Sequence, residues 1–450
     1  MRTILSRMLV TALVAALVLV VGVSVLPGAP MPGAGDRARL VGPRLLVIAP
    51  HPDDETIGTG GAIAAARRLG WHVTVVLVTN GDGFVEALRK RGGPEPSPEA
   101  MRQLGLRRAE ESRRGTSALG VEPDDLIFLG FPDARTMRLL LTNWDADKPL
   151  DALTGVSAVP YDFARNQGAP YTGASLDATL KEIITTTDPT TVLFPDPSDR
   201  HRDHRAIAAF TQAAMEETGY DGVRLTYLVH RLGFPVTLGN RPSAPLEPPR
   251  SLAAVGTNWR QLPLGRRAQA AKREALTHYR SQLAIERQLL ESFVRSTELY
   301  GTPPELTVGT DSSATIGDPT GDTPERQILP AADIASLQVL KSGQAVRLVL
   351  HLKGALSPDV TYALHARSLS PTDTRSFDAH ISDGRLSVEQ PSASSVSTGY
   401  SDFSASADQI SVTLPLELTR SARSMLIEAD TAANGRSVDF TAWRLLRFKK

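Results

Sequence analysis

Two short segments of the chain combine histidines with carboxylates directly after apolar, strand-like stretches. The first is RLLVIAPHPDDETIGTGG at residues 44–61, and the second is FPDPSDRHRDH at residues 194–204. The C-terminal ends of parallel strands lie along one edge of an open α/β sheet, so we expect the two groups to meet there. Imidazole and carboxylate, in a chain without cysteine, are the ligand types of a hydrolytic zinc site.

Three side chains are the predicted metal ligands. His51 and Asp54 lie three residues apart on a tight loop, a spacing that lets both turn toward one ion. His204 supplies the third ligand from the exit of the second strand. Three protein ligands leave a coordination position for water, which is typical of catalytic rather than structural zinc sites. The predicted ion is zinc, with another divalent metal as the alternative, and bound zinc lowers the pKa of such a water to about 7.

Three neighbouring residues are the predicted catalytic residues. Asp53 adjoins a ligand but is directed elsewhere by the backbone, so it is predicted to take the proton of water and return it to a leaving amine. His201, if cationic, is predicted to hydrogen-bond the oxygen that gains charge in a tetrahedral intermediate. Asp203, or another carboxylate, is predicted to keep that imidazole oriented and charged.

Each segment also has a non-catalytic interpretation. A single histidine after a strand is most often a surface or capping residue, and aspartates after a strand most often cap a helix. Both segments stand at strand exits of one α/β region, which favours the metal site. Gly58–Gly61 does not match a dinucleotide-binding loop, because Ile63 stands where the third glycine belongs. Asp145-Ala146-Asp147 is too short a match to indicate a sugar-transferase metal site.

The composition bounds the class of protein. The chain has 450 residues and a formal net charge of zero. Two domains are therefore expected, and no electrostatic argument favours binding to nucleic acid. Aromatic residues make up 5%, which argues against a surface for stacking bases. The absence of cysteine excludes disulfides, lipobox acylation and thiolate catalysis.

The N-terminus has the pattern of a targeting segment. Arg2 and Arg7 precede an uncharged apolar run at residues 8–26, and no clear cleavage motif follows. Residues 1–30 are therefore predicted to be either a cleaved signal peptide or a membrane anchor. The Pro- and Gly-rich residues 31–43 are predicted to be a linker.

Strand-like runs alternate with helical patterns over residues 44–230. This alternation predicts an α/β fold, a three-layer sandwich with a mainly parallel sheet and right-handed connections. The predicted strands are residues 44–49, 72–79, 126–129, 191–194 and 224–230. The first predicted helix opens at Gly60-Gly61 and ends at Gly70, and three further helices are predicted over residues 99–119, 175–187 and 266–296.

After about residue 305 the pattern changes to period-two alternation between Gly, Pro, Ser and Asp turns. This predicts an antiparallel β-sandwich over residues 331–450, after a linker at residues 301–330. Its scattered histidines are interpreted as structural. Trp443 is expected either on a sugar-binding face or in the core. The domain is accordingly predicted to bind carbohydrate or, with a slight preference, to shape the mouth of the active site.

The residues around both segments resemble a known family. APHPDDETIGTGG matches the opening signature of the LmbE-like, or PIG-L, zinc-dependent N-deacetylases. The similarity continues in order through VTNGDG at 78–83, Arg107-x-x-Glu110, ALGV at 118–121, LGFPD at 129–133 and HRDH at 201–204, and ends near AKREALTHYRSQ at 271–282. It spans roughly residues 44–295, and the corresponding predicted domain covers residues 44–300.

The resemblance implies a Rossmann-like fold and hydrolysis of the acetamide of an N-acetylglucosamine-type sugar. It implies the roles that the residue types also predict. These are His51, Asp54 and His204 as metal ligands, Asp53 as the base and His201 as the oxyanion donor. Arg107 and Asp133 match family positions that contact the sugar. The alternatives are an ion pair of Arg107 with Glu110 on its own helix, and a turn role for Asp133 after Pro132.

The predicted function is therefore removal of the acetyl group from an N-acetylated amino sugar or glycoconjugate, outside the cytoplasm. The predicted partners are that substrate and, through residues 8–26, a membrane; no nucleic acid is predicted, and no oligomeric state. The N-terminal apolar segment and the C-terminal β domain depart from the best-known members. They favour an envelope or extracellular glycan, glycolipid or secondary metabolite over intracellular thiol biosynthesis. The alternative is a non-catalytic envelope glycan-binding protein on a hydrolase scaffold.

Overall fold

The computed structural model describes residues 37–89, 95–322, 330–369, 375–389, 402–420 and 422–449. The predicted targeting segment, residues 1–30 with the apolar run at 8–26, lies outside the described residues. Among the described helices, none combines the length and the apolar character that a membrane crossing requires.

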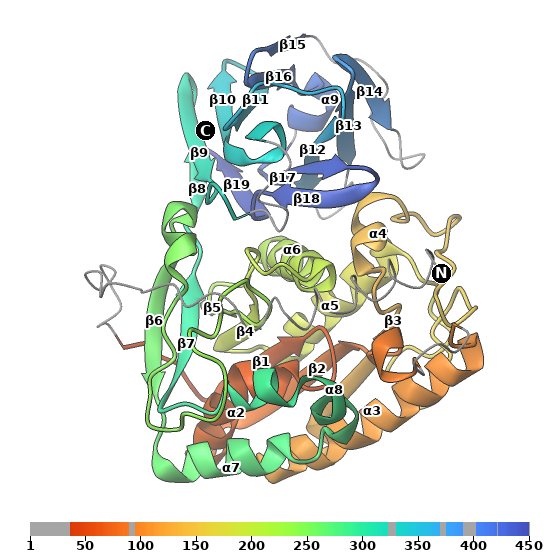
Figure 1. The fold of residues 1–450 in the computed structure, drawn as a ribbon, viewed down its shortest axis with the longest axis vertical. Helices are drawn as coiled ribbons and strands as arrows, with labels where there is room; N and C mark the ends of the chain where they lie inside the picture. Colours follow the sequence, from red (N-terminus) through yellow and green to blue (C-terminus); the bar gives the residue numbers. More distant parts are fainter. Residues whose placement is uncertain are drawn as a thin grey trace, which may run out of the picture. The chain divides into compact units, whose positions relative to one another are not determined.

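The first half of the described chain alternates strands and helices, as the sequence predicts (Figure 1). Its strands are β1 (Arg44–Ala49), β2 (His72–Thr79), β3 (Leu126–Phe131), β4 (Thr191–Pro195), β5 (Val223–Tyr227), β6 (Asn258–Pro263) and β7 (Thr297–Thr302). Its α-helices are α2 (Asp54–Arg68), α3 (Pro98–Ala118), α4 (Thr136–Leu141), α5 (Gly173–Thr187), α6 (Arg202–Glu217), α7 (Arg266–Leu276) and α8 (Arg280–Glu291). Short 3₁₀ helices are η1 (Val85–Ala87), η2 (Pro123–Asp125) and η3 (Arg250–Val255).

These strands form one mainly parallel sheet in the order β3-β2-β1-β4-β5-β7-β6. β1 pairs in parallel with β2 on one side and β4 on the other, with Val47 opposite both Val75 and Leu193. Only the pairs made by β7 are antiparallel. The chain order reverses at β1, between β2 and β4, and such a switch point is where α/β sheets bind ligands.

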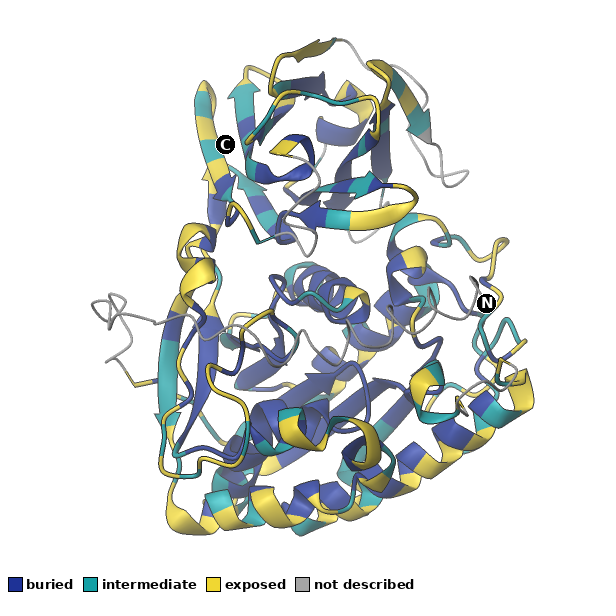
Figure 2. Cartoon of the chain, in the orientation of Figure 1, coloured by how far each residue is buried: buried dark blue, intermediate teal, exposed yellow. Residues whose placement is uncertain are grey.

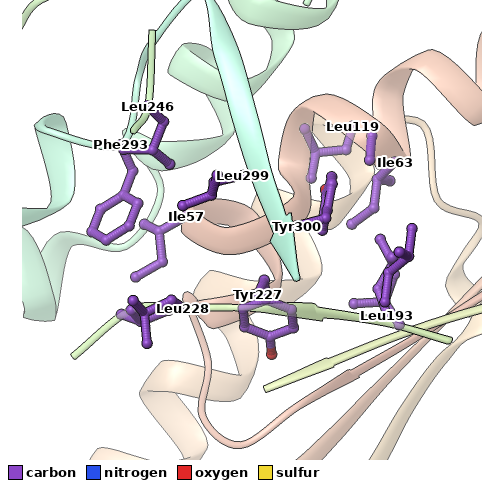
Figure 3. Close-up of a cluster of buried hydrophobic side chains, with 14 of the residues drawn as sticks. Ile57, Ile63, Leu119, Leu193, Tyr227, Leu228, Leu246, Phe293, Leu299 and Tyr300 are labelled. Atoms are coloured by element: carbon purple, nitrogen blue, oxygen red, sulfur yellow. The ribbon is translucent and has the colours of Figure 1, made fainter. Parts of the chain in front are cut away.

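Helices cover both faces of the sheet because β1 is apolar on both sides. Leu45 and Val47 belong to one hydrophobic cluster, with residues of α2 and α7, whereas Leu46 and Ile48 belong to another, with residues of α5 and α6. The central strands are dark blue, that is buried, in Figure 2. Figure 3 shows part of the first cluster around Tyr227. A strand buried on both faces reads as a continuous apolar run, which is why β1 is predicted correctly from sequence.

Helix α2 begins earlier than the sequence suggests. It starts at Asp54, three residues after the histidine of the first segment, and not after Gly60-Gly61. Gly58 and Gly61 lie inside α2 because neighbouring side chains pack too close to the helix for a Cβ at these positions. A Cβ at Gly58 would lie 2.5 Å from the ring of Tyr227, and one at Gly61 would lie 2.5 Å from Leu264. The predicted helix over residues 266–296 is likewise two helices, α7 and α8, followed by β7.

The second half of the described chain is almost entirely strands. These are β8 (Leu306–Val308), β9 (Ser312–Gly317), β10 (Ile334–Ser342), β11 (Ala345–Leu352), β12 (Val360–Leu369), β13 (Ser376–Ser382), β14 (Arg385–Glu389), β15 (Phe403–Ser406), β16 (Gln409–Thr413), β17 (Ser424–Ala433), β18 (Arg436–Phe440) and β19 (Arg444–Phe448), with the short helices η4 (Pro330–Ala332) and α9 (Leu416–Thr419). They form two sheets, β15-β16-β11-β10-β9 and β14-β13-β12-β17-β19-β8, with β18 on β17. Every pairing is antiparallel except β19 with β8. One hydrophobic cluster takes side chains from both sheets.

The C-terminal β region, meaning the described residues from 306 to 449, packs against the α/β region. Trp443 is 1% exposed and belongs to the cluster that contains α5 and α6, so it lies in the core and not on an open sugar-binding face. Residues 306–317, within the predicted linker, form β8 and β9. Residues 37–43, within the other predicted linker, contact β6 through the Ala38 N–H and the Gln261 carbonyl. The domain boundaries given above stay predictions.

Candidate active site

Five loops meet at the C-terminal edge of the parallel sheet. They follow β1, β2, β3, β4 and β5, and the two sequence segments supply the loops after β1 and β4. This is the arrangement that the sequence predicts, since parallel strands present their C-terminal ends at one edge.

Four imidazole rings gather at this edge. The ring centroid of His51 lies 4.7 Å from that of His201 and 5.3 Å from that of His204. His230, from the loop after β5, lies 4.8 Å from His204 and 5.1 Å from His201. Three of the four are predicted from the sequence, and His230 is an addition.

Asp54 joins two of these histidines. Its Oδ2 lies 3.1 Å from Nδ1 of His51 and 3.1 Å from Nε2 of His204, and it accepts a hydrogen bond from the backbone N–H of His51. The structure therefore brings the three predicted ligands together. His230 offers a fourth donor, since one ligand atom each of Asp54, His204 and His230 lie within 4.8 Å of one another.

The donors of this cluster fit a divalent metal. Oδ1 of Asp54, and Nε2 of His204 on the side of the ring that faces Asp54, are buried without a hydrogen bond among the described residues. Buried polar atoms are normally hydrogen-bonded, so atoms left without partners at one point indicate a missing ligand. Imidazole nitrogen and carboxylate oxygen are donors that zinc accepts, and other first-row divalent metals accept them too.

The cluster is strongly coupled electrostatically. Burial lowers the pKa of His204, but the carboxylates of Asp54 and Asp199 outweigh it and raise that pKa to about 9. Burial also opposes charge on Asp54, yet the adjacent His204 and His51 keep the pKa of Asp54 well below its usual range. The carboxylates thus stabilise positive charge at this point, which a metal ion would supply in place of protons.

Asp53 lies beside the ligands but has different partners. Its backbone N–H donates to Oε2 of Glu55 at 2.9 Å, and its carboxylate lies 3.5 Å from Nη2 of Arg108. Its φ of 119° is a strained conformation for a residue other than glycine. Burial raises the pKa of Asp53 well above its usual range, against the effect of Arg108, and the charges of Asp54 and Glu55 add to the rise. A carboxyl group with a raised pKa is suited to taking up a proton.

His201 is held as a neutral donor. The backbone N–H of Asp203 donates to Nδ1 of His201 at 3.3 Å, so a neutral ring carries its proton on Nε2. Burial, followed by the positive charge of His51, lowers the pKa of His201 to about 4. The cationic form considered from sequence is therefore disfavoured in the protein as described, but Nε2–H still donates.

Asp199 fixes the orientation of this group and is not among the predicted site residues. Its carboxylate accepts hydrogen bonds from the backbone N–H groups of His201, Val229 and His230, at 2.9–3.0 Å. Its Oδ2 also lies 3.2 Å from Nδ1 of His204. A carboxylate behind a metal-binding imidazole is a common way to orient it.

Comparisons with known proteins agree with this geometry. Residues 46–215 match the family model described as PIG-L, GlcNAc-PI de-N-acetylase. A 1D-myo-inositol 2-acetamido-2-deoxy-alpha-D-glucopyranoside deacetylase of Actinosynnema mirum is 44% identical over 91 residues, 20% of this chain and 30% of that protein. The protein of the same description from Mycobacterium sp. (strain KMS) is 31% identical over 174 residues, 39% of this chain and 50% of that protein.

Residues 46–215 form a PIG-L domain. The matched part spans half or less of the length of the two curated relatives. Among solved structures, an N,N'-diacetylchitobiose deacetylase from Pyrococcus horikoshii is 18% identical, with a TM-score of 0.36, over 58% of this chain and 84% of that chain.

Within the PIG-L domain, Asp133 and Asp203 both contact His51. Nε2 of His51 lies 3.2 Å from Oδ1 of Asp133 and 3.3 Å from Oδ2 of Asp203. The Asp203 carboxylate also accepts hydrogen bonds from the backbone N–H groups of Ala134 and Thr136. Asp203 is predicted to orient His201, but its carboxylate is directed to His51 and only its backbone N–H reaches His201. The sugar contact predicted for Asp133 stays a prediction.

The sugar contact predicted for Arg107 also stays a prediction. Its side chain is exposed, whereas the next residue, Arg108, is 3% exposed and donates to the carbonyls of Pro52 and Gly81. Consecutive residues of a helix point about 100° apart, so only one of two adjacent arginines on α3 can face the site.

The three residues missed from sequence left signals of different strength. Asp199 lies two residues before His201 in the second segment, and His230 ends a predicted strand whose exit reaches the same edge. Both residues could therefore have been predicted from their positions in the sequence. Arg108 gives no such signal, because its helical phase relative to the sheet depends on tertiary packing.

Proposed function

We propose that this protein is a zinc-dependent N-deacetylase that hydrolyses the acetamide of an N-acetylglucosamine-type sugar or glycoconjugate. The observation that carries the proposal is the convergence of His51, Asp54 and His204 at the switch point of the sheet, with Asp53 beside them. Membership of residues 46–215 in the PIG-L family supports the same reaction class. The two curated relatives are both deacetylases of a 2-acetamido sugar linked to inositol.

The residues that would hold the zinc ion are His51, Asp54 and His204, with His230 as a further donor. When bound, the ion supplies a positive charge that polarises the amide carbonyl and acidifies water. Asp199 orients His204, and Asp133 and Asp203 orient His51, through the contacts described above.

Two residues carry the proton transfers and charge stabilisation. Asp53 takes a proton from the attacking water, and the oxygen of that water forms a bond to the amide carbon. His201 donates a hydrogen bond from Nε2–H to the carbonyl oxygen as negative charge develops there. Asp53 then gives its proton to the nitrogen as the carbon–nitrogen bond breaks, so that the products are acetate and the free amino sugar.

The location and the wider architecture are part of the proposal. The apolar run at residues 8–26 would place the enzyme outside the cytoplasm, secreted or membrane-anchored. We also propose that the two C-terminal sheets pack as a β-sandwich. Its contacts with the site loops, through Arg200, Arg205 and Arg231, favour a role in shaping the active site over carbohydrate binding.

The proposal is tested with the purified full chain, stripped of metal by a chelator and reloaded with zinc chloride. Acetate and primary amine are measured after incubation with N-acetylglucosamine, N-acetylglucosaminyl inositol and N,N'-diacetylchitobiose. We expect equal amounts of both products from at least one compound, none with chelator present, and almost none from Asp53→Asn. Glycan binding without any release would instead favour the non-catalytic alternative.

A further inference from the structure

Four aspartates lie together in the C-terminal β region, apart from the histidine cluster. Asp318 follows β9, Asp322 is four residues further, Asp333 precedes β10, and Asp439 lies in β18. One carboxylate oxygen each of Asp318, Asp322 and Asp439 lie within 4.8 Å of one another. Asp318, Asp333 and Asp439 are 6%, 5% and 1% exposed, so this is an interior cluster.

Three of the four carboxylates use one oxygen in a contact with the protein. The contacts are Asp322 Oδ2 with the guanidinium of Arg231, Asp439 Oδ2 with the backbone N–H of Ile334 at 2.9 Å, and Asp333 Oδ2 with the backbone N–H of Gly321 at 2.8 Å. These contacts fix the orientation of the carboxylates.

The other oxygens are left without partners. Oδ2 of Asp318, Oδ1 of Asp322 and Oδ1 of Asp333 are buried and make no hydrogen bond within the described part of the chain. A buried acceptor without a partner costs about 1–3 kcal/mol, and more when it is charged. Asp318, which is almost fully buried, and Asp322 both belong to the group of three close carboxylates and both have an unpartnered oxygen, which indicates a cation bound between them, with Asp333 beside it.

The charges around this cluster also favour a bound cation. Burial and the neighbouring carboxylates raise the pKa of Asp318 well above its usual range, against the effect of Arg231. Three further cations lie nearby: Arg200, with Nη1 3.7 Å from Oδ2 of Asp322, Lys353, with Nζ 3.4 Å from Oδ2 of Asp333, and Arg444, whose charge acts on Asp318. The ion pairs of these cations are with Asp322 and Asp333, whereas Asp318 and Asp439 form no ion pair within the described part of the chain, so a divalent ion would supply positive charge beside those two carboxylates.

We propose that Asp318, Asp322 and Asp439, with Asp333 beside them, form a calcium site. The donors are all oxygens, which hard cations prefer to zinc and other softer ions. Calcium is favoured over magnesium because it accepts several carboxylates in irregular geometry, whereas magnesium keeps most of its waters and requires near-octahedral geometry.

Such a site would stabilise the loops of the histidine cluster. Arg231 follows His230, and Arg200 precedes His201 in the chain. Arg231 pairs with the Asp322 carboxylate, and Arg200 donates to the Asp322 carbonyl at 2.9 Å. An ion that fixes Asp322 would therefore also fix two arginines adjacent to the candidate catalytic histidines.

The test uses the full chain, stripped of metal and reloaded with one equivalent of zinc, so that the histidine cluster is filled. Calcium chloride is then added during thermal unfolding. We expect the Tm to rise by at least about 2 °C at saturating calcium, as ligand linkage predicts. We expect terbium luminescence to saturate at one equivalent and to be displaced by calcium. Absence of both effects would overturn the proposal, and an equal Tm rise with magnesium would overturn the assignment to calcium.

Two variants locate the effect. Asp318→Asn should abolish the calcium-dependent Tm rise while leaving the calcium-free Tm equal or higher, because it removes like-charge repulsion. Asp359→Asn, at an exposed aspartate outside the cluster, should keep the full rise. A calcium response retained in Asp318→Asn would place the ion elsewhere and contradict the proposal. None of these measurements depends on hydrolysis, so the result is independent of the proposed deacetylase function.

Discussion

Two buried histidines, His204 in the PIG-L domain and His365 in the C-terminal β region, each lie between two carboxylates, but their nitrogens are used differently. Both nitrogens of His365 are hydrogen-bonded, at 2.6 Å to Asp378 and 3.1 Å to Asp430. Neither nitrogen of His204 makes a hydrogen bond among the described residues. The first arrangement is a closed hydrogen-bonded network, whereas in the second Nδ1 is directed to Asp199 and Nε2, beside Asp54, is left for a metal.

The pKa does not distinguish the two sites. Carboxylates raise the pKa of His204 to about 9 and that of His365 to about 10, in both cases against the effect of burial. What differs is the surroundings. The ring centroids of three further imidazoles, those of His51, His201 and His230, lie 4.8–5.3 Å from that of His204. Beside the His365 network, the carboxylate of Glu428 lies 3.3 Å from Nη1 of Arg205. A guanidinium supplies there the positive charge that an ion would supply at His204.

The largest expected effect separates the two histidines directly. His204→Ala should lose bound zinc and lower turnover by at least about 10³-fold, because metal activation contributes several kcal/mol to the transition state. Zinc content by atomic emission and acetate release provide the measurement. His278→Ala, at a half-buried histidine outside the cluster, is the matched control and should keep both. Full zinc occupancy in His204→Ala would contradict the ligand assignment.

The adjacent carboxylates Asp53 and Asp54 should differ in whether zinc is retained when each is replaced. Asp53→Asn should keep zinc and lower kcat by about 10²–10⁴-fold, the usual contribution of a general base. Asparagine is chosen because it tolerates a positive φ better than alanine does. Asp54→Asn should instead lose zinc. Retained turnover in Asp53→Asn would remove this residue as the base.

The role of His201 is tested by the same assay at neutral pH. His201→Ala should lower kcat by about 10²–10³-fold with little change in zinc content, as loss of an oxyanion donor does. His201→Gln, which keeps an N–H donor, should recover part of the rate. An unchanged rate in His201→Ala would make the residue structural.

A smaller effect is expected from Asp199. Asp199→Asn should weaken zinc binding by about 10–100-fold, because the carboxylate orients His204. The measurement is competition with a chromophoric chelator. Excess zinc should restore most of the turnover, and a turnover that stays low at saturating zinc would indicate a direct role in catalysis.

His365→Gln should leave zinc content and kcat unchanged and affect stability alone. We expect the free energy of unfolding to fall by about 3–5 kcal/mol, because Asp378 and Asp430 lose their buried partner. Loss of zinc in this variant would contradict the distinction between His204 as a metal ligand and His365 as a structural residue.

The stabilising contribution of His365 should also depend on pH, and its direction follows from the raised pKa. The pKa of His365, about 10, exceeds its ordinary value, with Asp378 and Asp430 in contact and Glu428 and His380 nearby. Its stabilising contribution is therefore full below about pH 6.5 and disappears as pH rises through about 10. Unfolding in denaturant between pH 7 and 10 should show a decline in wild type that His365→Gln lacks.

The sequence predicted the parts of the structure that depend on local pattern. The apolar runs of β1 and β4 and the residue types at their exits sufficed to bring His51, Asp54 and His204 to one sheet edge. The start of α2 and the division of the helix at residues 277–279 were missed, because they depend on close packing against Tyr227 and on Tyr279, which is buried.

By itself, the sequence determined the donor set and its place at the ends of parallel strands, since strand burial and side-chain chemistry are local properties. Only the tertiary structure decided that His230 and Asp199 join the group, that Arg108 is buried beside Asp53, and that burial lowers the pKa of His201. Those outcomes depend on helical phase, burial and contacts between distant parts of the chain. The same holds for the carboxylates of the C-terminal β region, whose charges become significant only when folding removes them from water.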